Sequence, residues 1–136
     1  QTLGEKEYND TLTKYFTEEG IDFAIIGGSP AIHQFATIGA HVMISGGSLV
    51  RKDVPPFTKS GREPLSYAGI NSVGLRRRNY SDEQINNIQE AYRYLYLKGL
   101  NTNAALEEIA TQLPNSPEVN EILDFVKNSE RGIMKG

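Results

Sequence analysis

Cysteine is absent from the 136-residue sequence. This absence excludes a disulfide framework, a thiolate zinc site and catalysis by a thiol. Histidine is scarce as well, since His33 and His41 are the two in the chain. Two histidines eight residues apart, with no pair of carboxylates nearby, do not form a metal-coordination pattern. We therefore expect neither a metal site nor a cofactor.

Charged residues are missing from the whole of 23–50, although they make up 23% of the chain. The run exceeds the about 20 residues of a transmembrane helix, but glycines, a proline and histidines interrupt it and its apolar residues are periodic. We therefore do not expect it to span a membrane. No signal or transit peptide pattern opens the sequence, so we expect a soluble, cytoplasmic protein.

Basic residues are concentrated in 51–80, whereas 1–22 and 81–136 are acidic and the formal net charge is −3. This basic segment closes with Arg76-Arg77-Arg78. Overall acidity, and the lack of aromatic residues among the basic ones, argue against a nucleic-acid partner. The arginines either bind another anion or form a solvated surface, and the sequence leaves both open.

Aliphatic residues recur at every sixth position of the uncharged run. They are Ile26, Ile32, Ile38, Ile44 and Val50. A period of six fits neither the 3.6-residue helical period nor strand alternation. It is typical of a parallel β-helix, in which each hexad supplies a short strand and a turn and three hexads close one coil. The alternative, a series of β-hairpins with a chance repeat, is disfavoured by five aliphatic positions in register.

The segment 21–57 provides only about two coils, whereas solenoids usually need at least three repeats. Its core is therefore expected to pack against other surfaces, including sister subunits. Residues 1–20 show an aromatic and aliphatic face at helical spacing: Tyr8, Leu12, Tyr15 and Phe16. We expect an amphipathic helix there that caps the open first coil.

Consecutive prolines, Pro55 and Pro56, are expected to end the solenoid because proline cannot donate a backbone hydrogen bond. We expect 58–79 to be an extended, irregular basic connection, and 80–136 to be a helical domain.

A capping box at Ser81 predicts a helix to about Lys98 whose buried residues are Ile85, Ile88, Tyr92 and Leu95. A second helix is expected over 103–112. A third is expected from Ser116 to about Asn128, with Val119, Ile122, Phe125 and Val126 inward.

Four ordered motifs carry a resemblance to a known family. They are Asp22-Phe23-Ala24-Ile25-Ile26-Gly27-Gly28, Ile32-His33-Gln34-Phe35, Ile38-Gly39-Ala40-His41-Val42-Met43 and Gly69-Ile70-Asn71-Ser72-Val73-Gly74-Leu75-Arg76-Arg77-Arg78. With Asp53-Val54-Pro55-Pro56, they strongly resemble the C-terminal half of UDP-N-acetylglucosamine O-acyltransferase, the first enzyme of lipid A biosynthesis. Gly61-Arg62-Glu63-Pro64 and Ser129-Glu130-Arg131-Gly132-Ile133 look like the Bacteroides versions. The resemblance covers about 21–136 and leaves residues 1–20 unmatched.

This resemblance implies a fold and a set of partners. The family is a homotrimer of left-handed parallel β-helices with a C-terminal helical domain, and its active sites lie between subunits. It transfers a 3-hydroxyacyl chain from acyl carrier protein to the 3-hydroxyl of UDP-N-acetylglucosamine. We accordingly expect a mainly β protein with added helices: an N-terminal cap helix, about two left-handed β-helical coils and a three-helix C-terminal domain.

By motif position, the resemblance assigns five residues to substrate binding. His33 and Gln34 would line the substrate cleft, while Asn71, Arg77 and Arg78 would bind the nucleotide and its phosphates. Guanidinium groups offer paired donors to phosphate oxygens, and an asparagine amide both donates to and accepts from a pyrimidine edge. Gly46 and Gly47 fall where the family sets acyl length, but the local sequence differs and leaves that length open.

The sequence departs from the family at its catalytic residues. The general base of the family lies in a His-x-x-His-Asp motif, which this sequence does not contain. Phe16 and Thr17 stand where the family has the Gly-His pair that polarises the thioester. Each loss is expected to cost about 10²-fold in rate or more. We therefore assign no catalytic residue and expect an inactive, shortened or engineered chain, with binding of UDP-N-acetylglucosamine or acyl carrier protein as the alternative function.

Overall fold

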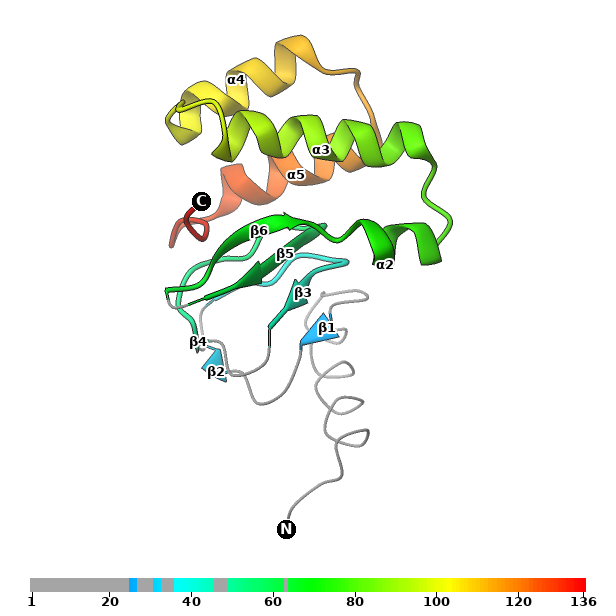
Figure 1. The fold of residues 1–136 in the computed structure, drawn as a ribbon. Coiled ribbons are helices and arrows are strands. Elements are labelled where there is room, and N and C mark those ends of the chain that lie inside the picture. Colours follow the sequence, from blue (N-terminus) through cyan, green and yellow to red (C-terminus); the bar gives the residue numbers. More distant parts are fainter. Residues whose placement is uncertain (1–24, 27–30, 33–35, 46–48, 63) are drawn as a thin grey trace.

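The computed structural model describes residues 25–26, 31–32, 36–45, 49–62 and 64–136 (Figure 1). The described chain begins with short strands that pair across successive turns of the backbone and ends with helices grouped on one side of the sheet (Figure 1). The expected cap helix in 1–20 lies outside the described residues, as do His33 and Gln34.

Six strands are described, and most are very short. β1 (Ile25–Ile26), β3 (Met43–Ile44), β5 (Thr58–Gly61) and β6 (Ser66–Ile70) form one sheet in the order β1-β3-β5-β6. β2 (Ala31–Ile32) pairs with β4 (Leu49–Val50) in a second sheet. The pairings among β1, β3 and β5, and between β2 and β4, are parallel, as stacked coils require.

The hexad repeat sets the register of these pairings. Ile26 pairs with Ile44, and Ile32 pairs with Val50, so each residue lies beside the one three hexads further along the chain. A parallel bridge between Ile38 and Val54 forms a third wall. Within the described residues, the chain thus follows the three-walled path that the repeat predicts.

Val54 rather than Pro56 stacks on Ile38, although Pro56 is the residue three hexads further on. Gly39 N–H donates to the Val54 carbonyl at 2.7 Å, and Val54 N–H donates to the Thr37 carbonyl at 2.9 Å. Proline has no N–H and cannot make the second of these bonds. The second coil is therefore two residues shorter than three hexads, and β5 pairs with β3 in the same shortened register.

The coil core consists of aliphatic side chains that are almost fully buried. Ile38, Ile44 and Val50 point inward as the repeat predicts, with exposed fractions of at most 1%. Val42 and Val54, which lie four residues after Ile38 and Val50, are fully buried too. Each hexad can therefore contribute two buried aliphatic residues to the core, the repeating one and the one four residues after it.

The expectation that 58–79 is irregular, and that the prolines end the parallel pairing, is wrong. β5 follows the proline pair and continues the sheet, β6 returns antiparallel to it, and α2 (Ser72–Arg77) comes next. The sequence gives little indication of β5 because the side chains that this strand buries are those of Thr58 and Ser60, not large apolar ones. Thr58 avoids an unsatisfied hydroxyl by donating to the Pro55 carbonyl at 2.9 Å.

The helices of the C-terminal region are confirmed close to their predicted bounds. α3 (Asp82–Tyr96) starts at the Ser81 capping box, α4 (Thr102–Gln112) is capped by Asn101, and α5 (Pro117–Asn128) is capped by Ser116. Both capping-box bonds are present, since Ser81 accepts from Gln84 N–H and Gln84 accepts from Ser81 N–H.

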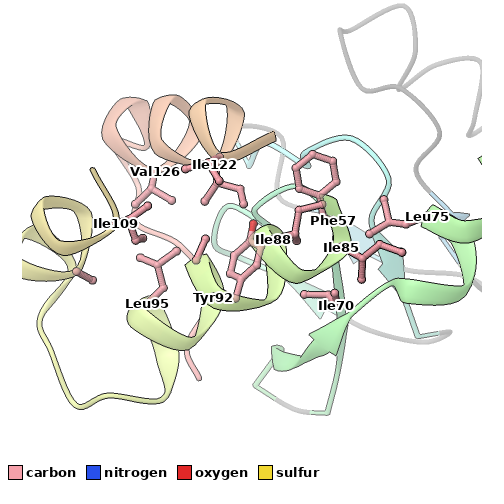
Figure 2. Packing of buried hydrophobic residues seen from close by; sticks show 13 residues of the cluster. Phe57, Ile70, Leu75, Ile85, Ile88, Tyr92, Leu95, Ile109, Ile122 and Val126 are labelled. Atoms are coloured by element: carbon pink, nitrogen blue, oxygen red, sulfur yellow. The ribbon is translucent and has the colours of Figure 1, made fainter. Parts of the chain in front are cut away.

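The faces of these helices bury the predicted residues, with one exception. Ile85, Ile88, Tyr92 and Leu95 of α3 are buried, as are Val119, Ile122 and Val126 of α5. Phe125 is only half-buried, so its predicted inward position is wrong. Figure 2 shows the buried side chains of α3, α4 and α5 meeting one another, with Phe57 and Ile70 of the strand region in the same cluster.

Three tyrosines join the helices to the sheet. Tyr67 of β6 stacks on Tyr96 at 4.5 Å and on Tyr92 at 5.6 Å between ring centroids. The Tyr92 hydroxyl donates to the Pro56 carbonyl, and the Tyr96 hydroxyl donates to the Met134 carbonyl at 2.9 Å. Burial raises the pKa of all three phenols, which keeps their hydroxyls protonated at physiological pH.

Residues 129–135, here called the C-terminal strap, return from α5 to the coils. Asp53 N–H donates to the Gly132 carbonyl at 3.0 Å, and Met134 N–H donates to the Asp53 carbonyl at 2.9 Å. The Asp53 carboxylate accepts from the Ser129 hydroxyl at 2.6 Å and from Thr37 N–H at 2.8 Å. Asp53 thus bonds the preceding coil and the strap simultaneously.

The strap also contributes to the coil core. Met134, which is 1% exposed, packs in the same cluster as Ile38, Ile44 and Val50, together with Leu65 from the turn between β5 and β6. Solenoid ends need such cover because they otherwise expose apolar side chains. No helix within the described residues is long and apolar enough to cross a membrane.

Replacing Asp53 with alanine should lower the free energy of unfolding by about 3 kcal/mol, because two hydrogen bonds to a buried carboxylate are lost and their donors remain. Asp124→Ala removes the same group from an exposed position of α5 and should change stability by less than about 0.5 kcal/mol. Urea unfolding measures both. Equal midpoints for Asp53→Ala and the unsubstituted chain would show that the strap contact is dispensable.

Candidate functional site

Three of the five predicted site residues lie together at the short helix α2. Asn71 is the residue that caps its start, Arg77 is its last residue, and Arg78 caps its end. The structure thus brings these three onto one element, beside the sheet and before α3 (Figure 1). His33 and Gln34 lie outside the described residues, so their position relative to α2 is not part of this geometry.

Asn71 is buried, with 1% of its surface exposed, and its side chain bonds in two directions. Its carbonyl oxygen accepts from Gly74 N–H at 3.3 Å, and its amide donates to the His41 carbonyl at 3.1 Å. Asparagine is a favoured cap because it satisfies a helix N–H that has no partner within the helix. One amide hydrogen and one oxygen lone pair remain beyond these bonds. Binding of a nucleotide by Asn71 stays a prediction.

Gly74 explains how Asn71 fits beneath the helix. A Cβ atom at position 74 would lie 2.5 Å from the Asn71 Nδ2 atom, which is closer than carbon and nitrogen approach without a bond. The first turn of α2 can therefore close over the asparagine only with glycine at this position.

The three arginines at the end of α2 have different surroundings. Arg76 and Arg77 are exposed, and the Arg76 Nε atom lies 4.0 Å from the Asp82 carboxylate. Arg78 is half-buried, and its guanidinium donates to the Gly74 carbonyl at 3.2 Å. Cations in the last turn also interact favourably with the negative end of the helix dipole. Arg77 is consequently the guanidinium most open to a solute, while Arg78 is held against the helix.

His41 lies in the coil next to α2, and its side chain is buried. It is 8% exposed, and its Nε2 atom lies 3.2 Å from the Tyr80 hydroxyl. The imidazole stacks on Phe57 with ring centroids 5.7 Å apart. Burial, with smaller contributions from the charges of Glu121 and Glu118, raises the pKa of Tyr80, so its hydroxyl stays protonated.

Tyr80 was not singled out from the sequence. It follows α2 in a short turn, outside any periodic pattern, and its partner His41 is 39 residues away. Aromatic residues near a helix end are common, so sequence alone offered no signal for this pair. The contact between Tyr80 and His41 is recognised only from the structure, in which the coil and the segment after α2 lie next to each other.

Two adjacent clefts lie elsewhere, between the second coil and α5. Their volumes are about 550 and 640 Å³, and both are lined by Thr37, Asp53 and Asn128. Neither is lined by the residues of α2. Among the residues that the structure describes, no three His, Asp or Glu side chains are grouped to hold a metal ion. Asn71, Arg77 and Arg78 therefore do not line these two clefts.

Comparison with known proteins assigns the family. Residues 53–134 match the second domain of UDP-N-acetylglucosamine O-acyltransferase. The chain belongs to this family. The matched residues include all of α2 and the strap contact made by Asp53.

The relatives agree in sequence and in structure. The chain is 40% identical over 114 residues to the acyl-(acyl-carrier-protein):UDP-N-acetylglucosamine O-acyltransferase of Thiobacillus denitrificans, covering 84% of this chain and 44% of that protein. Its counterpart in Stenotrophomonas maltophilia is 41% identical over 128 residues, covering 93% of this chain and 48% of that protein. This alignment extends into 1–20, which the motif resemblance left unmatched.

A crystal structure of a UDP-N-acetylglucosamine acyltransferase from Bacteroides fragilis superimposes with a TM-score of 0.83 at 50% identity. It covers 85% of this chain and 45% of that one. The acyltransferase of Francisella novicida gives a TM-score of 0.78 at 34% identity, over 85% of this chain and 43% of that one. The chain thus spans about half the length of the relatives it matches.

Asn71→Ala should lower the free energy of unfolding by about 2 kcal/mol, since a helix cap is lost and a buried carbonyl loses its donor. The matched control is Asn101→Ala, which removes an exposed cap from α4 and should cost about 1 kcal/mol. Thermal and urea unfolding measure the difference. If the two substitutions cost the same, the bond between Asn71 and His41 adds nothing to stability.

Proposed function

We propose that these 136 residues carry the part of a UDP-N-acetylglucosamine O-acyltransferase that recognises the nucleotide sugar. The proposal rests on one observation: the family match over 53–134 contains Asn71, Arg77 and Arg78, and the structure places all three on α2. The relatives are named as O-acyltransferases that use acyl-(acyl-carrier-protein) and UDP-N-acetylglucosamine.

The chemistry of α2 suits a diphosphate. Guanidinium groups bind phosphate oxygens through two parallel hydrogen bonds, which fixes the ligand's orientation as well as its charge. The exposed side chain of Arg77 is able to adjust its position to a ligand. The guanidinium of Arg78 is oriented by its hydrogen bond to the Gly74 carbonyl. Asn71, His33 and Gln34 complete the proposed substrate contacts on the strength of the family resemblance.

Taken by themselves, these residues are proposed not to transfer an acyl group. Attack of a sugar hydroxyl on a thioester needs a base to accept the proton and donors to stabilise the oxyanion. The His-x-x-His-Asp motif that supplies the base in the family is absent from this sequence. His41 is buried between Phe57 and Tyr80, a position that does not favour a second role as base.

A homotrimer of left-handed parallel β-helices is the proposed assembly. The family resemblance supports it, and so does the small size of the coil core within one chain. In this arrangement the substrate cleft would lie between subunits, in the cytoplasm.

Size exclusion with light scattering tests the assembly. At micromolar concentration, we expect three times the chain mass of 15.1 kDa. A stable species of one chain mass would contradict the proposed trimer, because two short coils would then suffice as a core.

Isothermal titration of the full chain with UDP-N-acetylglucosamine tests the binding function. We expect saturable heat at millimolar ligand or below, and at least about tenfold weaker binding by Arg77→Ala, because a charge-assisted contact to phosphate is lost. Arg93→Ala is the control, since it removes an exposed guanidinium on α3 that pairs with Glu90. No heat at millimolar ligand, or equal loss in both variants, would contradict nucleotide recognition by α2.

The same titration with acyl carrier protein examines the second partner, which the basic 51–80 segment favours. An acyl-transfer assay with both reactants addresses catalysis. Product at the level of the control without protein agrees with the proposal, whereas product above it would show that another group serves as the base.

A further inference from the structure

His41 contacts the residues at both ends of α2. It lies in the coil between Ile38 and β3, at φ 59°, a left-handed conformation that is uncommon outside glycine and in which asparagine, aspartate and histidine are enriched. This conformation is compatible with its carbonyl accepting from Asn71, the residue that caps the start of the helix, at 3.1 Å. Its main chain therefore fixes one end of α2.

The imidazole of the same residue reaches the other end. Its Nε2 atom lies 3.2 Å from the hydroxyl of Tyr80, whose N–H donates to the Leu75 carbonyl at 3.0 Å and so closes the last turn of α2. The rings of His41 and Tyr80 meet edge to face with centroids 5.3 Å apart. One buried residue of the coil thereby holds the segment before α2 and the segment after it.

Phe57 anchors this contact in the protein interior. Its ring is 1% exposed, stacks on His41 and meets Tyr80 at 6.0 Å between centroids. Its N–H donates to the Ala40 carbonyl at 2.9 Å, and its carbonyl accepts from Asn71 N–H at 2.7 Å. Figure 2 places Phe57 beside Leu75 of α2 and Ile85 of α3, within the helical cluster.

α2 depends on such contacts because it is too short to be stable alone. It has six residues, whereas isolated helices below about 12 residues are marginal in water. Leu75 is fully buried beneath it, while Val73, Arg76 and Arg77 are exposed. The orientation of its arginines is therefore set by what holds its two ends.

We propose that His41 and Tyr80 are positioning residues that hold both ends of α2 and thereby orient Arg77 and Arg78 toward an anionic ligand. The ligand part of this inference rests on the proposed nucleotide binding. The part of the inference that concerns the position of α2 rests only on the observed contacts. Separate experiments can therefore test the position of α2 and the binding of the ligand.

Hydrogen exchange of the full chain tests the holding of α2. Tyr80→Phe removes one hydroxyl and keeps the ring, and it should accelerate exchange of the Leu75 and Arg78 amides about threefold to tenfold. The Asn120 amide of α5 should not change. Tyr94→Phe, which alters a half-buried ring on α3, is the matched control and should leave α2 unaffected. Unchanged α2 exchange in Tyr80→Phe would overturn the inference.

A second variant identifies the partner of the hydroxyl. His41→Asn keeps a residue that tolerates the left-handed conformation and keeps the carbonyl that Asn71 bonds, but it removes the imidazole. In that background, Tyr80→Phe should have no further effect on α2 exchange, because both changes remove the same hydrogen bond. A full additional acceleration in the double variant would overturn the pairing of these residues.

Titration with UDP-N-acetylglucosamine tests the orientation of the arginines. If the unsubstituted chain binds, Tyr80→Phe should weaken binding about threefold to tenfold, with Tyr94→Phe unchanged. Unchanged affinity in Tyr80→Phe would overturn the link between the holding of α2 and the ligand while leaving the proposed function intact. If the unsubstituted chain does not bind, the proposed function fails, and the exchange experiment still decides whether His41 and Tyr80 hold the helix.

Discussion

The rest of the described structure depends on the four hydrogen bonds made by Asp53. Its carboxylate binds the preceding coil at Thr37 and the strap at Ser129, and its main chain pairs with the strap on both sides of Ile133. A buried carboxylate is costly without partners, so these bonds favour only the arrangement in which coil, α5 and strap meet. The same strap then supplies Met134 to the coil core.

This connection gives the small coil core support that it lacks by itself. The sheet continues through β5 and β6, and β6 carries Tyr67 into the stacked tyrosines of α3. The coil and the helices therefore meet along one boundary. It contains the stacked rings of Tyr67, Tyr92 and Tyr96 and the backbone pairing of Asp53 with the strap. α2 lies beside this region, and His41 of the coil contacts the residues before and after it, so the element that carries Asn71, Arg77 and Arg78 is held by the coil.

Sequence reasoning worked where the determining contacts are local or strictly periodic. The capping box at Ser81 and the buried face of α3 depend on residues three or four apart, and the hexads fixed the register of β1 and β3. It failed where burial used small polar residues, as in β5, or where a structure depends on distant partners, as for α2 and the strap. Of the candidate site, motif resemblance found Asn71, Arg77 and Arg78, but not the contact of Tyr80 with His41.

The measurement that most directly tests this account is native-state hydrogen exchange read at two places: Val54 in the coil wall and Tyr92 in α3. If the boundary makes coil and helices one cooperative unit, both amides should exchange with the same free energy of opening, within about 0.5 kcal/mol. Both should also respond equally to low concentrations of denaturant. An opening free energy for Val54 that lies several kcal/mol below that of Tyr92 would show that the coils unfold independently and that the boundary does not hold them.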